Sequence, residues 1–193
     1  SRGLGDVYKR QPDDLPEVGL KAWQASMEYP GNVTAFVAPA NHAWDPAGGD
    51  VDIPDIPAPK TLSDDEIMEA AKALRNSDSA ALFMGGHALR ESGLIQAGLF
   101  AEVTGARLIT ETFFTRQQRG VGRVETERLP YFGEMAAEHL QGLDTLVIVG
   151  SKPPVSFFAY PGKPGWLSPE GASLLKMGDH SVDAIDTLTR IAN

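Results

Sequence analysis

Three short groups of glycine, basic and small polar residues each follow an apolar run of the chain. A glycine after a strand lets a helix begin close to a bound phosphate or ring, and a nearby Arg or Lys neutralises the phosphate. The groups are Gly85-Gly86-His87 with Arg90, Glu111-Thr112 with Arg116, and Gly150-Ser151-Lys152. Our candidate ligand contacts, should a nucleotide or flavin bind, are Gly85, Gly86, Arg90, Thr112, Arg116 and Gly150.

The paired glycines at positions 85 and 86 form only part of a known phosphate-binding motif. Leu89 occupies the position of the last glycine of the dinucleotide-binding pattern Gly-x-Gly-x-x-Gly, and the Walker lysine motif is absent. Paired glycines at the end of a strand more often form a tight turn than a phosphate cradle. We also expect His87 to cap a helix or lie at the surface rather than to act as a base.

The sequence offers no residues to which nucleophilic, acid-base or metal-dependent catalysis can be assigned. The chain has no Cys, which excludes thiolate nucleophiles, disulfides and Cys-ligated metal sites. The four histidines stand far apart, and Ser, His and Asp form no recognisable nucleophile motif. We therefore predict that this chain contains neither a catalytic residue nor a metal site.

The charge and hydropathy of the chain favour small-molecule partners. A net charge of -9 argues against binding to nucleic acid or to an anionic membrane surface, because both require basic patches. The sequence has no apolar run that approaches the roughly 18 to 20 residues of a membrane span. It also shows no basic and apolar leader with a cleavage site. These features predict a cytoplasmic protein.

Two loop segments each allow two interpretations. Residues 116–123 concentrate arginine and glycine and could clasp an anion, but we give more weight to a solvated loop whose arginines pair with Glu125, Glu127 and Glu134. Residues 157–166 are rich in aromatic side chains, which must pack on something. For this second loop we favour an interface with a neighbouring domain over a ligand pocket.

The N-terminal elements form a small unit that precedes a linker. Residues 15–28 predict a helix, Pro30-Gly31-Asn32 ends it, and residues 33–38 predict a strand. One helix and one strand cannot form a core by themselves. From Pro39 to Lys60 the chain is rich in Pro, Gly, Asp and Ala, so no helix can persist. We place an extended interdomain linker at residues 44–60.

The first eleven residues are interpreted as an artefact. Asp6 to Gln11 matches the translation of a transposon-end sequencing adapter, and the chain opens at Ser1 without Met. We therefore exclude residues 1–11 from the fold. The alternative is a disordered natural or tag-derived terminus, which would be equally irrelevant to function.

Residues 61–193 predict an α/β domain. Ser63 to Glu66 is a capping box that begins a helix. Apolar runs over 80–84, 108–110, 145–150 and 173–177 predict strands buried on both faces. Further helices are predicted between and after these strands, over about 88–103, 133–140 and 182–191. Ser181 is the expected N-cap of the last helix. This alternation is typical of an open parallel sheet flanked by helices, which is a Rossmann-like arrangement.

Several segments resemble a known enzyme family in their order and spacing. One resemblance is to the last helix-strand junction of the pyrimidine-binding domain in acetolactate synthase large subunits. It rests on Pro30-Gly31-Asn32, the apolar run after it and Pro39-Ala40-Asn41, where the family usually has Asp in place of Asn41. Residues 80–86, 105–114, 129–132, 144–150 and 157–164 resemble the central domain of an acetolactate-synthase-like subgroup. The resemblance to this thiamine-diphosphate-dependent family runs from about Pro12 to the last residue.

The resemblance implies that the chain is a fragment of a larger enzyme. It assigns residues 12–43 to the C-terminal tail of a pyrimidine-binding domain and residues 61–193 to the central domain. In this family, thiamine diphosphate lies between the pyrimidine-binding domain, whose glutamate activates the aminopyrimidine, and a pyrophosphate-binding domain. The Gly-Asp-Gly...Asn motif of the latter holds magnesium and the diphosphate. Thiamine diphosphate and Mg²⁺ would thus bind the parent at sites outside this chain.

The resemblance also bears on FAD. The central domain binds FAD in true acetolactate synthases and has lost it in relatives such as benzoylformate decarboxylase. The flavin-associated Met-Leu-Gly-Met-His-Gly stretch is absent here, and residues 114–123 take its place. We therefore expect a parent enzyme without FAD.

Three functional hypotheses follow. In the first, the intact parent decarboxylates a 2-oxo acid and passes the product to an acceptor. The parent is then a homo-oligomer that also contains the two missing domains. This piece serves as its scaffold and is inactive alone. The second is a nucleotide- or FAD-binding module without thiamine chemistry. The third is a purely structural interaction domain. A Gly-Asp-Gly...Asn motif in the coding sequence downstream of Asn193 would select the first hypothesis.

Overall fold

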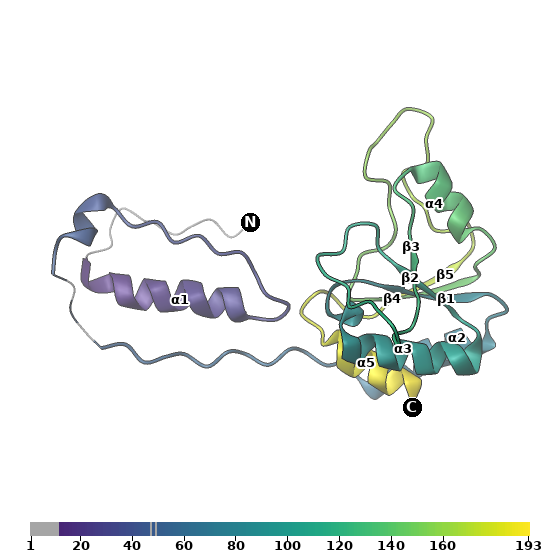
Figure 1. The fold of residues 1–193 in the computed structure, drawn as a ribbon, viewed down its shortest axis with the longest axis horizontal. Coiled ribbons are helices and arrows are strands. Elements are labelled where there is room, and N and C mark those ends of the chain that lie inside the picture. The colour runs from purple at the N-terminus through teal and green to yellow at the C-terminus, as the bar shows by residue number, and fades with distance from the viewer. Residues whose placement is uncertain (1–11, 47, 49) are drawn as a thin grey trace. The chain divides into compact units, whose positions relative to one another are not determined.

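The computed structural model describes residues 12–46, 48 and 50–193 (Figure 1). It divides the chain into two units, with the boundary between Pro59 and Lys60. We describe each unit by itself. The interpretation of residues 1–11 as an artefact lies outside the described residues, and the assignment of the units to domains of a larger enzyme stays a prediction.

The N-terminal unit is built around one helix, α1 (Leu15–Met27), which follows the 3-10 turn η2 (Pro12–Asp14). This helix was expected from the sequence, but none of its residues is buried. A second 3-10 turn, η3 (Ala40–Ala43), contains the buried His42. Because one helix offers little surface to cover, the unit has no apolar core among its described residues.

The predicted strand at residues 33–38 is wrong. These residues form no strand and lie exposed, with the Phe36 side chain 47% accessible. The Thr34 hydroxyl donates to the carbonyl of Ala22, 3.0 Å away, which holds the segment beside α1. A strand requires a neighbouring strand to satisfy its backbone amides and carbonyls, and the described part of this unit contains none.

The segment predicted as a linker has no regular secondary structure between residues 50 and 59. The Gln24 side chain donates to the carbonyl of Asp55 at 2.7 Å, and the Gly48 amide donates to the Asp13 carboxylate at 2.9 Å. The segment therefore returns along α1 within the N-terminal unit (Figure 1). Its prolines explain the extended backbone, since proline cannot continue a helix.

The C-terminal unit contains the parallel α/β sheet that the sequence predicts. Its strands are β1 (Ala80–Met84), β2 (Arg107–Thr110), β3 (Glu127–Arg128), β4 (Thr145–Val149) and β5 (Ser173–Lys176). They lie in the order β3-β2-β1-β4-β5, and every pairing is parallel. All residues of β1 and β4 are buried, as expected for central strands covered on both faces.

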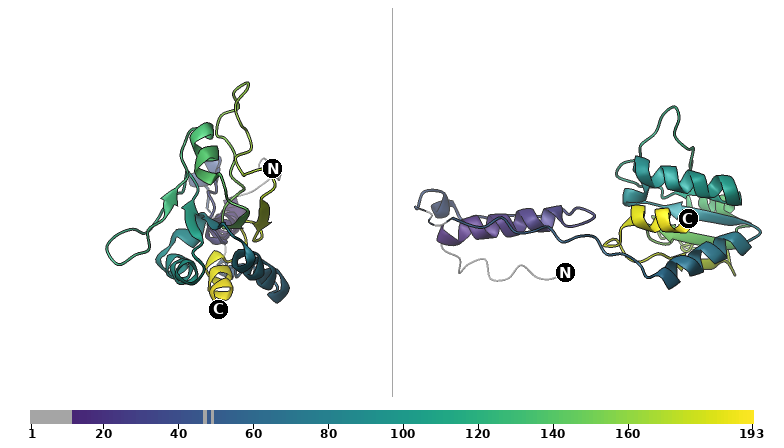
Figure 2. Two further views of the ribbon diagram at one scale, coloured as in Figure 1. Left: turned by 90° about the vertical axis from the view of Figure 1, so that its right-hand side faces the viewer. Right: turned by 90° about the horizontal axis from the view of Figure 1, so that it is seen from below.

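Helices cover the two faces of this sheet (Figure 1 and Figure 2). On one face, α2 (Asp64–Asn76), α3 (Glu91–Thr104) and α5 (Ala184–Ala192) pack against Leu82 and Met84 of β1. On the other face, α4 (Gly133–Leu140) packs against Ala81 and Phe83. Successive residues of β1 therefore point to opposite layers, and the sheet with its helices forms three layers.

The ends of the helices confirm one predicted cap and correct two predicted starts. Ser63 accepts from the Glu66 amide and its own amide donates to the Glu66 carboxylate, so the capping box before α2 is present. The N-cap of α5 is Asp183 and not Ser181, because the Asp183 carboxylate accepts from two first-turn amides while Ser181 bonds Asp179. The turn η4 (Gly86–Leu89) delays the start of α3 to Glu91.

The turns after β1 and β4 contact each other through their backbones. The Gly85 amide donates to the carbonyl of Val149 at 3.1 Å. Gly150 has a φ of +67°, and a Cβ atom added there would lie 2.6 Å from the Gly85 carbonyl oxygen. Glycine at position 150 is therefore required both by the left-handed backbone and by the close approach of the neighbouring turn.

Substitution of Gly150 should destabilise the fold more than substitution of a glycine with the same backbone conformation in open space. Gly142 has a φ of +84°, and an added Cβ would meet nothing within 4 Å. We expect Gly142→Ala to lower the free energy of unfolding by about 1 kcal/mol, through left-handed strain alone, and Gly150→Ala by more than about 2 kcal/mol. Urea denaturation of both variants measures the difference, and equal losses would contradict the proposed contact.

Candidate functional site

The order of the strands indicates the edge of the sheet at which a ligand would bind. The chain runs from β1 outward to β2 and β3, and then returns to β4 on the other side of β1 before it reaches β5. The direction of winding therefore switches between β1 and β4. In open α/β sheets, ligands bind beyond the carboxyl ends of the strands at such a switch point.

The register of the strands places three residues in one row at this edge. Met84 of β1 is paired with Thr110 of β2 on one side and with Val149 of β4 on the other. The residues that follow are Gly85, Glu111 and Gly150. The Glu111 amide donates to the carbonyl of Met84 at 3.1 Å, which fixes Glu111 beside the turn of β1.

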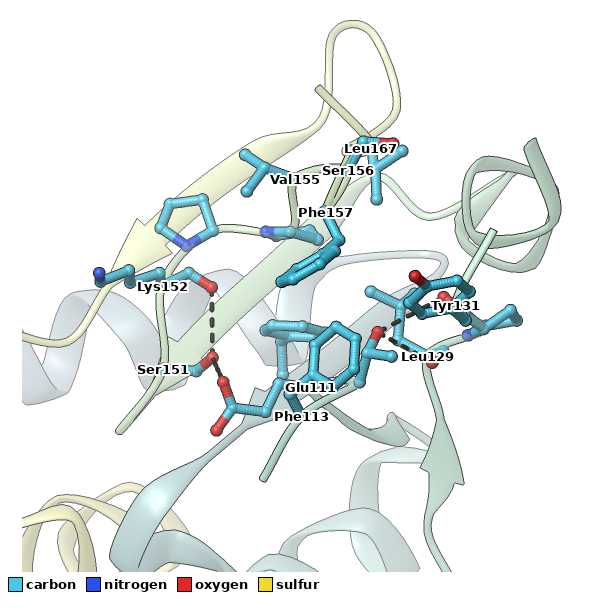
Figure 3. A pocket seen from close by; sticks show the side chains of 15 residues that line it. Glu111, Phe113, Leu129, Tyr131, Ser151, Lys152, Val155, Ser156, Phe157 and Leu167 are labelled. Carbon is cyan, nitrogen blue, oxygen red and sulfur yellow. Dashed lines mark hydrogen bonds between the residues drawn. The ribbon is translucent and has the colours of Figure 1, made fainter. Parts of the chain in front are cut away.

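A pocket of about 280 Å³ lies at the same edge (Figure 3). Its inner side includes Phe83 and Leu129, which belong to the buried cluster beneath α4. Polar groups enter from Glu111, Ser151 and Lys152, and aromatic rings from Phe113, Tyr131 and Phe157. The pocket thus combines one acidic side chain, one basic side chain and an aromatic wall.

Glu111 is the partly buried carboxyl group of this pocket. Burial raises the pKa of Glu111, and this effect outweighs the hydrogen bonds from the Ser151 hydroxyl and the Gly86 amide and the charges of His180 and Lys152, which lower the pKa. The Ser151 hydroxyl lies 3.2 Å from the Glu111 Oε2 atom (Figure 3). A Cβ atom on Gly85 would lie 2.4 Å from Glu111 Oε1, so the glycine leaves room for the carboxylate. The fold therefore holds an acidic group where water is partly excluded.

The aromatic wall is a connected cluster of rings from three segments. The ring centroids of Phe113 and Phe157 are 5.0 Å apart, and those of Phe113 and Tyr131 are 5.7 Å apart with the rings perpendicular. Phe132, Phe158 and Tyr160 extend the cluster outward. These separations are typical of favourable aromatic pairs. The side chains nevertheless remain exposed, with 64% of Phe157 accessible.

The structure brings together some of the predicted ligand contacts and separates others. Gly85, Gly86 and Gly150 meet at the switch point, where an added Cβ at Gly86 would lie 3.2 Å from the Gly150 carbonyl oxygen. Thr112 lines the pocket, but its hydroxyl donates to the carbonyl of Leu129 at 3.0 Å. This hydroxyl is therefore engaged by the backbone of the chain.

The two predicted phosphate-binding arginines do not line the pocket. Arg90 stands at the N-terminal end of α3, and its Nη1 atom is buried without a hydrogen-bond partner among the described residues. Arg116 is exposed in the loop after β2. Their role toward a nucleotide or flavin stays a prediction that the arrangement of the pocket does not support.

The expected ion pairs of the arginine-rich loop are wrong. Arg123 pairs with Glu91 of α3 at 2.9 Å. Glu127 pairs with Arg107 of the neighbouring strand at 2.5 Å, and Glu134 pairs with Lys163. The sheet places Glu127 and Arg107 on adjacent parallel strands, so a partner distant in sequence replaces the nearer arginines.

The sequence pointed to the two segments that contain Glu111 and Ser151, but it did not identify these two residues as parts of one site. The available signal was a polar residue directly after a buried strand. This signal identifies a site only once the register of β1, β2 and β4 shows that the residues after these strands lie side by side. The sequence favoured a domain interface over a ligand pocket for the aromatic loop. The interface stays a prediction, and in the structure Phe157 of this loop forms a wall of the pocket.

Comparison with known proteins explains the resemblance seen in the sequence. A search of protein-family models gives no match. The chain is 36% identical, over 99% of its length, to a Mycobacterium tuberculosis protein described as "Putative acetolactate synthase large subunit IlvX". The five-stranded parallel sheet flanked by helices matches a domain of thiamine-diphosphate-dependent enzymes. The chain is homologous to thiamine-diphosphate-dependent enzymes of the acetolactate synthase type.

Solved structures of thiamine-diphosphate-dependent enzymes share this fold. A "putative thiamin diphosphate-dependent enzyme" from Mycobacterium smegmatis matches 94% of the chain with a TM-score of 0.73 and 21% identity, over 37% of its own length. Benzoylformate decarboxylase from Polynucleobacter necessarius matches 94% of the chain with a TM-score of 0.72 and 21% identity, over 36% of its length. The chain also spans only 37% of the M. tuberculosis relative.

Membrane-spanning helices and metal-ligating clusters are both absent from the part of the chain that the structure describes. No helix in the described ranges is both long and apolar enough to cross a membrane. Within the same part of the chain, no group of three or more His, Asp or Glu side chains is arranged to hold a metal ion.

Replacement of Glu111 by a neutral amide should stabilise the protein. Because the pKa of Glu111 is raised by the fold, the folded state disfavours the charged form, and this penalty is fully present at pH values above the folded pKa. The penalty is lost as the pH falls through the folded pKa toward the unfolded value. We expect Glu111→Gln to raise the melting temperature at pH 7 by about 2 °C, and the gain should shrink toward pH 4.

Thermal unfolding monitored by circular dichroism at several pH values tests this expectation. Glu125→Gln is the matched control, because Glu125 is an exposed carboxylate of the loop before β3. The control should leave the melting temperature unchanged. A loss of stability in Glu111→Gln at pH 7 would show that the carboxylate stabilises the fold.

Proposed function

We propose that this chain is part of a longer thiamine-diphosphate-dependent enzyme that decarboxylates a 2-oxo acid and transfers the product to an acceptor. The observation that carries the proposal is the 36% identity over nearly the whole chain to one 37% stretch of an acetolactate synthase-like protein. The three-layer fold of the C-terminal unit supports it, since solved thiamine-diphosphate-dependent enzymes contain the same arrangement. In this proposal the chain is a scaffold and is inactive alone.

The two units correspond to two domains of that longer enzyme. Residues 12–43 form the C-terminal tail of the pyrimidine-binding domain, residues 44–60 the linker, and residues 61–193 the central domain. Two features support the division. The N-terminal unit has a helix and an extended segment without a sheet, and the five-stranded sheet with its helices lies entirely after Lys60.

The residues of this chain do not fit thiamine diphosphate and Mg²⁺. Diphosphate and magnesium require a cluster of oxygen ligands, and the described residues provide no such cluster of acidic side chains. The arginines near the switch point do not line the pocket there. We therefore place thiamine diphosphate and Mg²⁺ on the pyrimidine- and pyrophosphate-binding domains of the same polypeptide and derive no chemical step through residues of this chain.

The proposed parent enzyme works without FAD. The absence of the flavin-associated Met-Leu-Gly-Met-His-Gly stretch, in whose place residues 114–123 stand, supports this part of the proposal. The alternative function, a nucleotide- or FAD-binding module without thiamine chemistry, is favoured by one observation, the pocket at the topological switch point.

The exposed aromatic cluster is proposed as the surface that contacts the missing domains of the same polypeptide. Tyr131, Phe132, Phe158 and Tyr160 are all more than 40% accessible and project from neighbouring loops. Contiguous apolar patches of this kind mark interaction surfaces. The parent is proposed to be a cytoplasmic homo-oligomer, and the net charge of -9 supports the absence of nucleic acid and membrane partners.

Titration calorimetry with thiamine diphosphate and Mg²⁺ tests the proposal on the purified chain. Because the sequence lacks the metal-binding motif and the described residues contain no acidic cluster, we expect no saturable binding at micromolar concentration and no turnover of pyruvate. The matched control is the same chain extended through its natural downstream sequence and its natural upstream domain, which should bind both. Micromolar binding to the chain alone would overturn the assignment of the cofactor site to other domains.

A further inference from the structure

The pocket at the switch point has the size and chemistry of a site for a small ring. Its volume of about 280 Å³ is at the low end for ligand pockets. The pocket is formed wholly within the C-terminal unit, from Phe83 of β1 and from the loops after β2, β3 and β4. The proposed function, which concerns thiamine chemistry elsewhere in the polypeptide, does not use it.

The carboxylate of Glu111 has acceptor capacity that the protein leaves available. An ionised carboxylate offers about four lone-pair positions, and among the described residues two groups donate to Glu111, the Ser151 hydroxyl and the Gly86 amide. In the described part of the chain, Glu111 takes part in no ion pair. A ligand with two parallel N–H donors would satisfy the remaining positions in the manner of a charge-assisted pair.

The walls of the pocket favour a flat and cationic ligand. Phe113, Tyr131 and Phe157 present exposed rings to the pocket that Glu111 also lines (Figure 3). Aromatic faces attract both other rings and cations, and the attraction is strongest where water is partly excluded. A negative charge next to three aromatic rings is a combination that selects aromatic cations over neutral or anionic rings.

The basic groups that act on Glu111, Lys152 of the pocket and His180 beside it, do not reverse this preference. Lys152 and His180 are both exposed, whereas Glu111 is partly buried and lies directly against the turn of β1. Charges in solvent are screened more strongly than charges that are partly buried. The deeper carboxylate therefore sets the charge that a bound ring meets.

We propose that the pocket between Glu111 and Phe157 binds a small planar aromatic cation of the amidine or aminoheterocycle class. Two N–H groups of the ligand donate to the Glu111 carboxylate, and its ring packs on Phe113 and Phe157. The site requires Glu111 in its ionised form. Binding is therefore coupled to the release of a proton when the carboxyl group is protonated beforehand, and the affinity falls as the pH is lowered.

Benzamidine is a suitable probe, and benzoate is its anionic counterpart of the same shape. In ¹H–¹⁵N spectra of the full chain at pH 7, benzamidine should shift the amides of Gly85, Gly86 and Ser151 with a Kd on the order of 1 mM. Benzoate should not. Lowering the pH to 5 should weaken the binding of benzamidine.

Two variants and one control separate the proposed contacts from general effects. Glu111→Gln should raise the Kd for benzamidine at least tenfold and remove its pH dependence, and Phe157→Leu should raise the Kd several-fold. Glu125→Gln should leave the Kd unchanged. The proposal is overturned if benzoate binds as well as benzamidine, if neither probe binds, if the shifted amides lie elsewhere, or if Glu111→Gln keeps the wild-type affinity.

Discussion

The carboxyl ends of β1, β2 and β4 lie in one row, and the residues that follow them are packed against one another through their backbones. Gly85 and Gly150 approach so closely that a methyl group on either would meet the carbonyl of the other turn. The register of the three strands imposes this contact, because Met84 is paired with both Thr110 and Val149. The Glu111 carboxylate lies against this pair of turns, and Ser151 of the pocket follows the second of them.

The same constraint explains why a carboxyl group is held where burial disfavours its charge. Glu111 follows β2 directly and has its amide bonded to the carbonyl of Met84, so its side chain must lie over Gly85. Proteins tolerate such locally unfavourable groups most often at functional sites, because activity and stability make different demands. The raised pKa of Glu111 therefore connects the pocket to ligand recognition, and the pocket has no assigned step in thiamine chemistry.

Much of the fold could be predicted from local pattern, and the site could not. β1 and β4 are continuous apolar runs, and Ser63 with Glu66 has the spacing of a capping box, so each was readable in sequence. β3 was missed because two charged residues at the sheet edge carry no apolar signal. The strand expected at residues 33–38 was wrong because the described part of the N-terminal unit offers no neighbouring strand to pair with its backbone. The pocket depends on strand register and on loops far apart in sequence, such as those of Glu111 and Phe157, which are 46 positions apart. No local pattern encodes either.

The pKa of the Glu111 carboxyl group tests most directly whether the strand ends hold this group where water is partly excluded. Selective ¹³C labelling of glutamate allows the side-chain carboxyl signal of Glu111 to be followed by NMR as the pH is lowered, with Glu111→Gln used to assign the signal. The account predicts an apparent pKa above the ordinary glutamate value of about 4.3, because the carboxylate is partly buried beside the turn of β1. A pKa at or below that value would contradict the claim that the strand ends desolvate this group.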